Sequence, residues 1–182
     1  MFTWHFQRPQ DDLFIYSDSD WAGCRRTRKS TQGYVVNYGN HCIKSHSSTQ
    51  ATIALSSAEA EYYALVKSGS VALGMQAMYT DFGVKVGIKL HTDASGAKGI
   101  AQRRGLGKLR HVDVHLLWLQ QKVANGTFSV HKVDGKVNPA DLLTKYLSRE
   151  DMKGHMRRLH YDHADGRAAV CSHLVTDTAV PQ

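Results

Sequence analysis

The chain has 182 residues, of which 42% are hydrophobic and 21% charged, which is typical of one soluble globular domain with an added tail. Its formal net charge of +7 favours a polyanionic partner such as nucleic acid. The chain contains no run of about 18 apolar residues, so the sequence predicts no membrane span. The start "MFTWHFQRPQDD" lacks the basic and apolar stretches of a signal peptide. We therefore expect no membrane association and no secretion. The three cysteines lie far apart, which favours a reducing compartment and argues against structural zinc.

The first half of the chain predicts three strands in succession. Residues 13–18 alternate as a strand, and "STQGYVVNYG" predicts a second strand that ends in the turn residues Gly39 and Asn40. "HCIKSHSS" and "TQATIALS" predict a third strand with an interruption. Short turns between consecutive strands favour an antiparallel meander.

A change to helical periodicity follows. Ser56 and Glu59 have capping-box spacing at the start of a long helix that Gly83 ends. The remaining predicted elements are, in chain order, a strand over 87–93, a short helix in "ASGAKGIAQR", a helix in "HVDVHLLWLQQKVANG", a strand over 127–133, and a helix that Asn138 caps and Pro139 opens. This order predicts an α/β domain with a five-stranded mixed sheet, three antiparallel strands then two further strands, and helices packed on both faces.

Four acids lie at the ends of predicted elements: Asp18 after the first strand, Glu61 early in the long helix, Asp93 after the fourth strand and Asp141 in the last helix. Each alone has an ordinary explanation as a turn, cap or surface residue. Residues at such positions can converge at one edge of a layered domain. We expect no lysine side chain to pair with these four carboxylates. Converging carboxylates need a cation or raised pKa values. Hard oxygen ligands suit Mg²⁺ or Mn²⁺, two of which form a phosphoryl-transfer site. Asp20 shares a strand face with Asp18 and is the alternative first ligand.

Two basic segments are the candidate nucleic-acid contacts, because phosphates supply the counter-charge. A solvated surface is the alternative for either segment alone. The candidate residues are Arg25, Arg26, Arg28, Lys29, Ser30 and Thr31 in the first segment, and Lys108, Arg110 and His111 in the second.

Six ordered motifs together resemble one family. "YSDSDWAG", "RKSTQGYVV", "ALSSAEAEYYAL", "LHTDASGA", "LRHVDVHLLWL" and "VNPADLLTKYL" are similar to the ribonuclease H domain of copia-type retrotransposon Pol polyproteins. The resemblance implies the ribonuclease H fold over residues 13–149. It leaves 1–12 as the remnant of an upstream polymerase or connection segment, and 150–182 as a weakly structured C-terminal extension.

The resemblance also implies an activity, which is hydrolysis of the RNA strand of RNA–DNA hybrids during reverse transcription with two Mg²⁺ or Mn²⁺ ions. Asp18 would then bridge both ions, Glu61 and Asp93 would hold the nucleophile-side ion, and Asp141 would hold the other. Its partners would be the hybrid and an upstream reverse transcriptase domain, in the cytoplasm within a virus-like particle.

Two rival functions remain open. One is a catalytically silent nucleic-acid-binding module of a degenerate retrotransposon copy. The other is an integrase-type transferase, which is disfavoured because the acids run in the order Asp, Glu, Asp, Asp. The family's cellular members carry a histidine before the last acid, whereas this chain has Lys136 in "VDGKVNPAD", which favours slower turnover.

Overall fold

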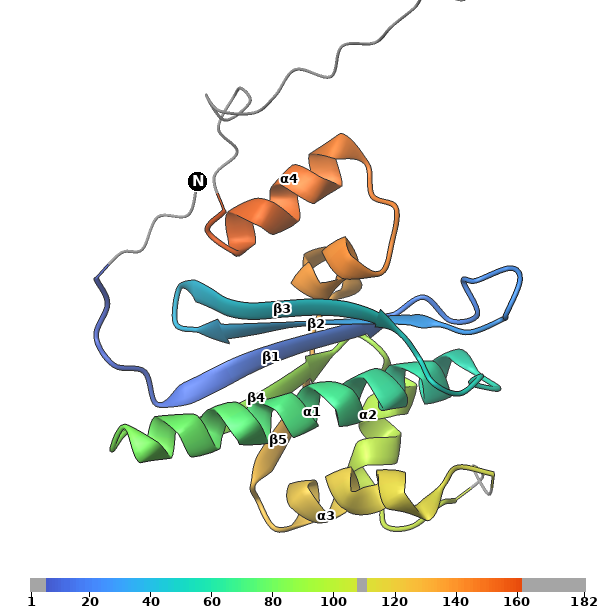
Figure 1. The fold of residues 1–182 in the computed structure, drawn as a ribbon, viewed down its shortest axis with the longest axis horizontal. Coiled ribbons are helices and arrows are strands. Elements are labelled where there is room, and N and C mark those ends of the chain that lie inside the picture. The colour runs from blue at the N-terminus through green and yellow to red at the C-terminus, as the bar shows by residue number, and fades with distance from the viewer. Residues whose placement is uncertain (1–5, 108–110, 162–182) are drawn as a thin grey trace, which may run out of the picture.

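The computed structural model describes residues 6–107 and 111–161, and a single mixed sheet organises them (Figure 1). The elements are β1 (Asp12–Ser19), β2 (Thr31–Tyr38), β3 (His41–Thr49), α1 (Ser57–Asp81), β4 (Gly87–Thr92), α2 (Ser95–Gln102), η1 (Val114–Leu117), α3 (Trp118–Ala124), β5 (Phe128–Lys132), η2 (Gly135–Val137), η3 (Pro139–Leu143) and α4 (Arg149–Arg158), where η denotes a 3₁₀ helix. None of the helices in the described part of the chain is long and apolar enough to cross a membrane.

The five strands lie in the order β3-β2-β1-β4-β5. β1 pairs antiparallel with β2 and β2 antiparallel with β3, whereas β1, β4 and β5 run parallel. The predicted five-stranded mixed sheet is therefore confirmed, and the meander is its antiparallel half. Because β1 and β4 are parallel, their carboxyl ends meet at one edge of the sheet.

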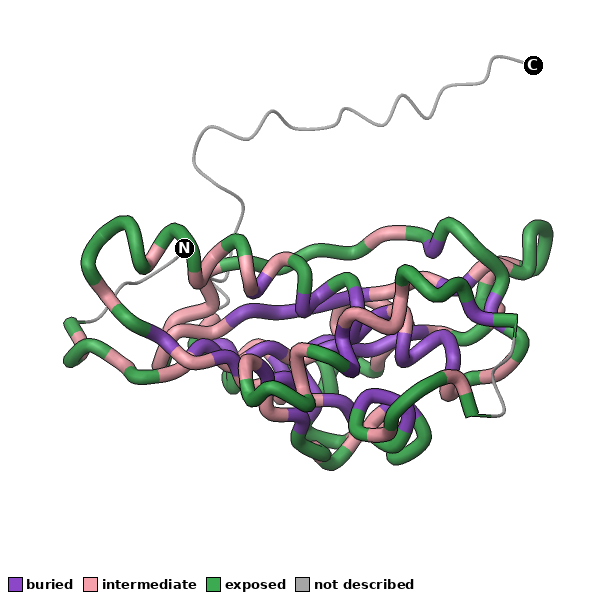
Figure 2. Tube along the Cα trace, turned by 90° about the horizontal axis from the view of Figure 1, so that it is seen from below, coloured by how far each residue is buried: buried purple, intermediate pink, exposed green. Residues whose placement is uncertain are grey.

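Helices cover both faces of the sheet, as the sequence predicts. α1, α2 and α3 lie on one side, and η3 and α4 lie on the other (Figure 1). The core between α1 and the sheet contains Leu13, Ile15, Leu65 and Leu90, each with no exposed surface. Buried stretches accordingly run through the middle of the molecule (Figure 2).

The start of α1 follows the capping prediction in part. Ser56 is the N-cap, and its side chain accepts a hydrogen bond from the Glu59 backbone N–H. The Glu59 side chain, however, accepts from the Leu55 N–H at 3.2 Å, one residue before the cap. Glu59 is only 1% exposed, so it is a buried acid and not a surface one.

Four predicted elements differ from the structure. The third strand ends at Thr49, and "TQATIALS" adds no strand after that residue. The helix expected over "HVDVHLLWLQQKVANG" is a 3₁₀ turn followed by the short α3, and the helix after Asn138 is also 3₁₀. Finally, the start of the extension expected to be weakly structured forms α4, which Ser148 caps by accepting from the Asp151 N–H. The boundaries at 12/13 and 149/150 stay predictions.

Candidate active site

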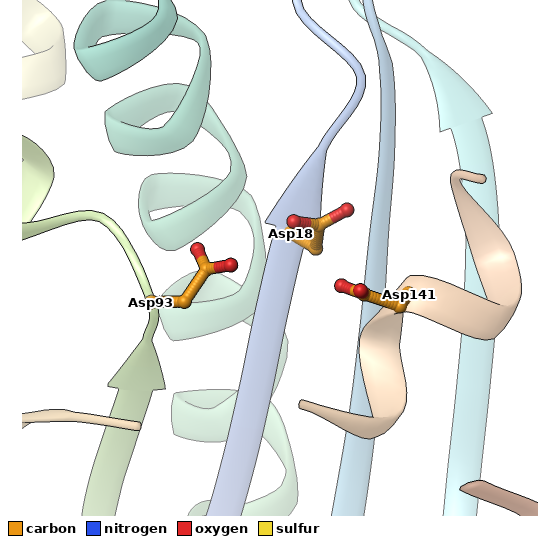
Figure 3. Close-up of side chains that lie close together, drawn as sticks. All are labelled: Asp18, Asp93 and Asp141. Carbon is orange, nitrogen blue, oxygen red and sulfur yellow. The ribbon is translucent and has the colours of Figure 1, made fainter. Parts of the chain in front are cut away.

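The parallel pairing of β1 and β4 brings the first and third acids together. Tyr16 lies opposite His91 in the register of these strands. Asp18 and Asp93 each lie two residues further on, so they sit at the same level of the sheet edge. Figure 3 shows the Asp93 carboxylate on the loop after β4, beside that of Asp18.

η3 brings the fourth acid to the same place. Asn138 is fully buried, and its side chain donates to the Ser17 carbonyl at 3.0 Å and accepts from the Ala140 N–H at 3.2 Å. This anchor ties the start of η3 to β1. Gly33, opposite Asp18 on β2, gives η3 room, because a Cβ there would lie 2.7 Å from the Leu143 Cβ.

Three of the predicted acids therefore form one cluster. Asp18, Asp93 and Asp141 each offer a carboxylate oxygen, and these three oxygens lie within 4.8 Å of one another (Figure 3). Asp18 is 1% exposed and Asp141 8%, so the cluster is largely removed from water. The alternative first ligand, Asp20, is not part of it, because its Oδ1 accepts a short hydrogen bond from the Thr31 N–H.

Glu61 of α1 borders this cluster. Its Oε1 accepts from the backbone N–H of Ser19 at 3.0 Å and from the Ser19 hydroxyl at 3.1 Å. Its Oε2 is buried and has no hydrogen-bond partner. Burial, together with the nearby charges of Asp18 and Asp93, raises the pKa of Glu61 to about 8. An unpartnered carboxylate oxygen facing other acids is the feature that a bound cation would satisfy.

The sequence analysis missed two side chains that do pair with the acids. The Lys145 Nζ lies 3.0 Å from Asp18 Oδ1 and 2.9 Å from Asp141 Oδ1, and the Thr144 hydroxyl donates to Asp18 Oδ2. The expectation of no matching lysine is thus wrong. The signal was present, since Lys145 follows Asp141 by four residues, the spacing of a helical ion pair.

The pKa values of the other two affected acids reflect these surroundings. Burial raises the pKa of Asp18 to about 6, although the hydrogen bond from Thr144 and the charge of Lys145 lower it. Burial also raises the pKa of Asp93. For Lys145, burial alone would lower the pKa, but the two carboxylates raise it above its ordinary value. Oxygen ligands of this kind suit a hard divalent ion such as Mg²⁺ or Mn²⁺.

Comparison with known proteins places this cluster in a family context. The Pol polyprotein of transposon RE1 of Arabidopsis thaliana is 31% identical over 140 residues, which is 75% of this chain and 10% of that protein. The Pol polyprotein of transposon TNT 1-94 of Nicotiana tabacum is 29% identical over 136 residues, 74% of this chain and 10% of that protein. The chain is homologous to part of the Pol polyproteins of copia-type retrotransposons. It spans about a tenth of the length of these curated relatives.

The fold agrees with this homology. The structure of LC11-RNase H1, isolated from compost, matches with a TM-score of 0.51 and 17% sequence identity over 74% of this chain and 94% of that one. The chain therefore has the ribonuclease H fold. No protein-family model matches the chain.

The predicted nucleic-acid contacts fall into three groups in this Pol homologue. Arg25, Arg26 and Arg28 are exposed on the loop that leaves the end of β1, close to Asp18 in sequence, and Lys29 is partly buried. Thr31 opens β2 and is partly exposed, so it stays a candidate.

Both residues of the second group make contacts within the protein. Ser30 is fully buried, and its hydroxyl accepts from the Ala22 N–H at 2.9 Å. It shapes the loop and has no exposed surface, and its predicted contact with nucleic acid stays a prediction. The Nε2 of His111 lies 2.8 Å from Glu59 Oε2, so this ring is engaged within the protein.

The third group, Lys108 and Arg110, lies outside the described residues. Their predicted contacts with nucleic acid stay predictions.

Proposed function

We propose that the chain is a divalent-metal-dependent endonuclease that hydrolyses the RNA strand of RNA–DNA hybrids. The observation that carries this proposal is the meeting of Asp18, Asp93 and Asp141 within 4.8 Å, with Glu61 beside them. The ribonuclease H fold and the copia-type relatives support the same activity.

The four acids would hold the metal ions. When bound, such ions supply a nucleophilic water at neutral pH and stabilise the departing 3′-oxygen. The protein's own part is to fix the ligands. Ser19 holds the Glu61 carboxylate through two hydrogen bonds, and Thr144 holds that of Asp18. Ligands held on a strand end and on helix starts need little rearrangement when the substrate arrives.

The loop with Arg25, Arg26 and Arg28 would bind the sugar-phosphate backbone. These side chains are exposed at the sheet edge that carries Asp18, and phosphate contacts fix register without reading sequence. The Pol context of the relatives supports a role in reverse transcription, next to an upstream reverse transcriptase and within a cytoplasmic particle.

A cleavage assay tests the proposal. Purified chain with Mg²⁺ or Mn²⁺ is incubated with a hybrid labelled on the RNA strand, and with the matching RNA and DNA duplexes as controls. We expect cleavage of the hybrid RNA alone. Asp93→Asn should lower the rate by at least about a hundredfold. Asp93 is the partly exposed member of the cluster, so its neutral isostere perturbs folding least. A folded chain that cuts with neither metal contradicts the proposal.

A binding assay separates the nuclease from the silent binding module. Replacing Arg25, Arg26 and Arg28 by Ala should weaken hybrid binding at low salt by about tenfold or more and flatten its salt dependence. Binding that shows this pattern without any cleavage by the wild type would identify the binding module instead.

A further inference from the structure

Lys145 is a cation built into the acidic site. Its ammonium lies 3.0 Å from Asp18 Oδ1 and 2.9 Å from Asp141 Oδ1, two of the three residues whose carboxylates cluster. The two acids come from different elements, β1 and η3, and both are at least nine-tenths buried. An ammonium between two carboxylates occupies the kind of position that a divalent ion takes when it is held by the same two oxygens.

The backbone fixes this position. The Lys145 N–H, two residues after the end of η3, donates to the Asp141 carbonyl at 3.0 Å. η3 is itself held to β1 by the hydrogen bond from Asn138 to the Ser17 carbonyl. Lys145 therefore starts from a rigid point beside Asp18, and only its flexible side chain has freedom.

We propose that Lys145 is an internal counter-ion that fills the Asp18–Asp141 side of the site until a divalent ion displaces it. This inference rests on the proposed function, because it concerns the same carboxylates. It makes Lys145 a positioning residue: it holds the two acids together in the metal-free protein and competes with the ion that replaces it. Binding of the ion then exchanges one cation for another at two fixed carboxylates.

The surroundings give the displaced ammonium a place to go. The Lys145 side chain is 38% exposed, so its end can leave without opening the core. A cavity of about 270 Å³ lies on its flank, lined by Asp20, Thr31, Leu142, Leu143, Thr144, Lys145 and Tyr146. Asp20 supplies a carboxylate there that belongs to no metal cluster in the described residues. The lysine thus moves from one acidic environment to another.

A second ion pair on the sheet provides the matched control. Lys89 Nζ lies 2.6 Å from Asp12 Oδ2, and these side chains are 37% and 26% exposed. Lys89 is as exposed as Lys145 but lies on β4, away from the acidic cluster. Replacing Lys89 removes one lysine and one ion pair but changes no residue of the acidic site.

Metal binding in the absence of nucleic acid tests the inference. The affinity of the full chain for Mn²⁺ is measured by calorimetry for the wild type, Lys145→Met and Lys89→Met. We expect Lys145→Met to bind Mn²⁺ roughly fivefold or more tightly, because its competitor is gone. Its melting temperature should fall in EDTA and recover in Mn²⁺. Lys89→Met should bind as the wild type does and melt lower in both conditions.

Lys145→Arg gives the second arm. It keeps the positive charge, so its Mn²⁺ affinity should stay within about twofold of the wild type. If Lys145→Met does not fold in EDTA, Lys145→Gln refolded in Mn²⁺ replaces it. Unchanged or weaker Mn²⁺ binding by the neutral variants overturns the inference, since a purely structural lysine would give that result.

The two proposals fail in different ways. If the wild type cleaves the hybrid and Lys145→Met binds Mn²⁺ with unchanged affinity, only the counter-ion inference is contradicted. If that variant binds Mn²⁺ more tightly and the wild type does not cleave, only the proposed nuclease activity is contradicted.

Discussion

The two halves of the acidic site deal with their negative charge differently. On the Asp18–Asp141 side, Lys145 pairs with both carboxylates and Thr144 donates to one of them. On the other side, Glu61 keeps a buried oxygen without a partner, and its pKa is raised to about 8. The Lys145 ammonium offsets the negative charge of Asp18 and Asp141, whereas Glu61 avoids a negative charge by holding a proton.

This difference teaches what a bound metal would have to overcome in each half. A divalent ion must displace an ammonium from Asp18 and Asp141, whereas beside Glu61 it must displace a proton. Above about pH 7 the first competition depends little on pH, because Lys145 keeps its charge and Asp18, with a pKa of about 6, is already ionised. The second competition depends on pH, and the two can therefore be separated by experiment.

Glu61→Gln should have the largest effect, and in two directions. Its cleavage rate should fall by at least about a hundredfold, because a proposed metal ligand is lost. Without metal, however, the variant should gain stability at high pH. The folded wild type holds a proton on Glu61 up to a pKa of about 8, whereas the unfolded chain loses it near the ordinary glutamate pKa of 4.5. Wild-type stability therefore falls as pH rises through this window.

The measurement is chemical unfolding in EDTA at pH 5 and pH 8. Glu61→Gln, which cannot ionise, should exceed the wild type by about 4 kcal/mol at pH 8 and by less than about 1 kcal/mol at pH 5. Asp81→Asn, at the exposed end of α1, controls for the loss of one surface charge. Equal differences at both pH values would show that Glu61 is not the proton-holding group.

The wild type itself should show the next effect, which is a metal stabilisation that grows with pH. Protons compete with metal at Glu61, with a pKa of about 8, and at Asp18, with a pKa of about 6. The rise in melting temperature on adding Mg²⁺ in excess over EDTA should be clearly larger at pH 8 than at pH 6. A shift that is equal at the two pH values would mean that the ion binds away from these acids.

The sequence predicted the convergence of the acids because element ends are readable from local patterns. Asp18 and Asp93 lie at the ends of strands in which apolar and polar residues alternate. Asn138 as N-cap and Pro139 as first residue mark the start of η3. The strand order, which puts β1 between β2 and β4, is a property of long-range pairing. The sequence analysis predicted only a five-stranded mixed sheet, and the order of its strands comes from the structure.

The local chemistry of the site was harder to predict. Lys145 was overlooked because its partner Asp18 lies 127 residues away, and only its spacing from Asp141 is visible locally. The burial of Ser30 was equally hard to predict, because polarity in a basic segment suggests a surface, whereas the loop folds back and buries the hydroxyl. Both cases concern which polar groups find a partner inside the protein, and that depends on tertiary contacts.

Glu59 extends the comparison to a buried acid that is fully partnered. It lies two residues before Glu61 on α1, yet its carboxylate accepts from the Tyr63 hydroxyl at 2.6 Å and from the Leu55 N–H at 3.2 Å. Its Oε2 also lies 2.8 Å from His111 Nε2. A carboxylate with three neighbours of this kind needs no metal, which separates its role from that of Glu61.

His111→Ala should accordingly have the smallest effect. Removing one of the three partners of Glu59 should lower the free energy of unfolding by about 1 kcal/mol, because the other two hydrogen bonds remain. Hybrid affinity should change by less than about twofold, since the ring is engaged by Glu59. Unfolding and hybrid binding are measured side by side, with His115→Ala, a more exposed histidine nearby, as the control. A tenfold loss of affinity with unchanged stability would instead restore His111 to the nucleic-acid interface that the sequence predicted.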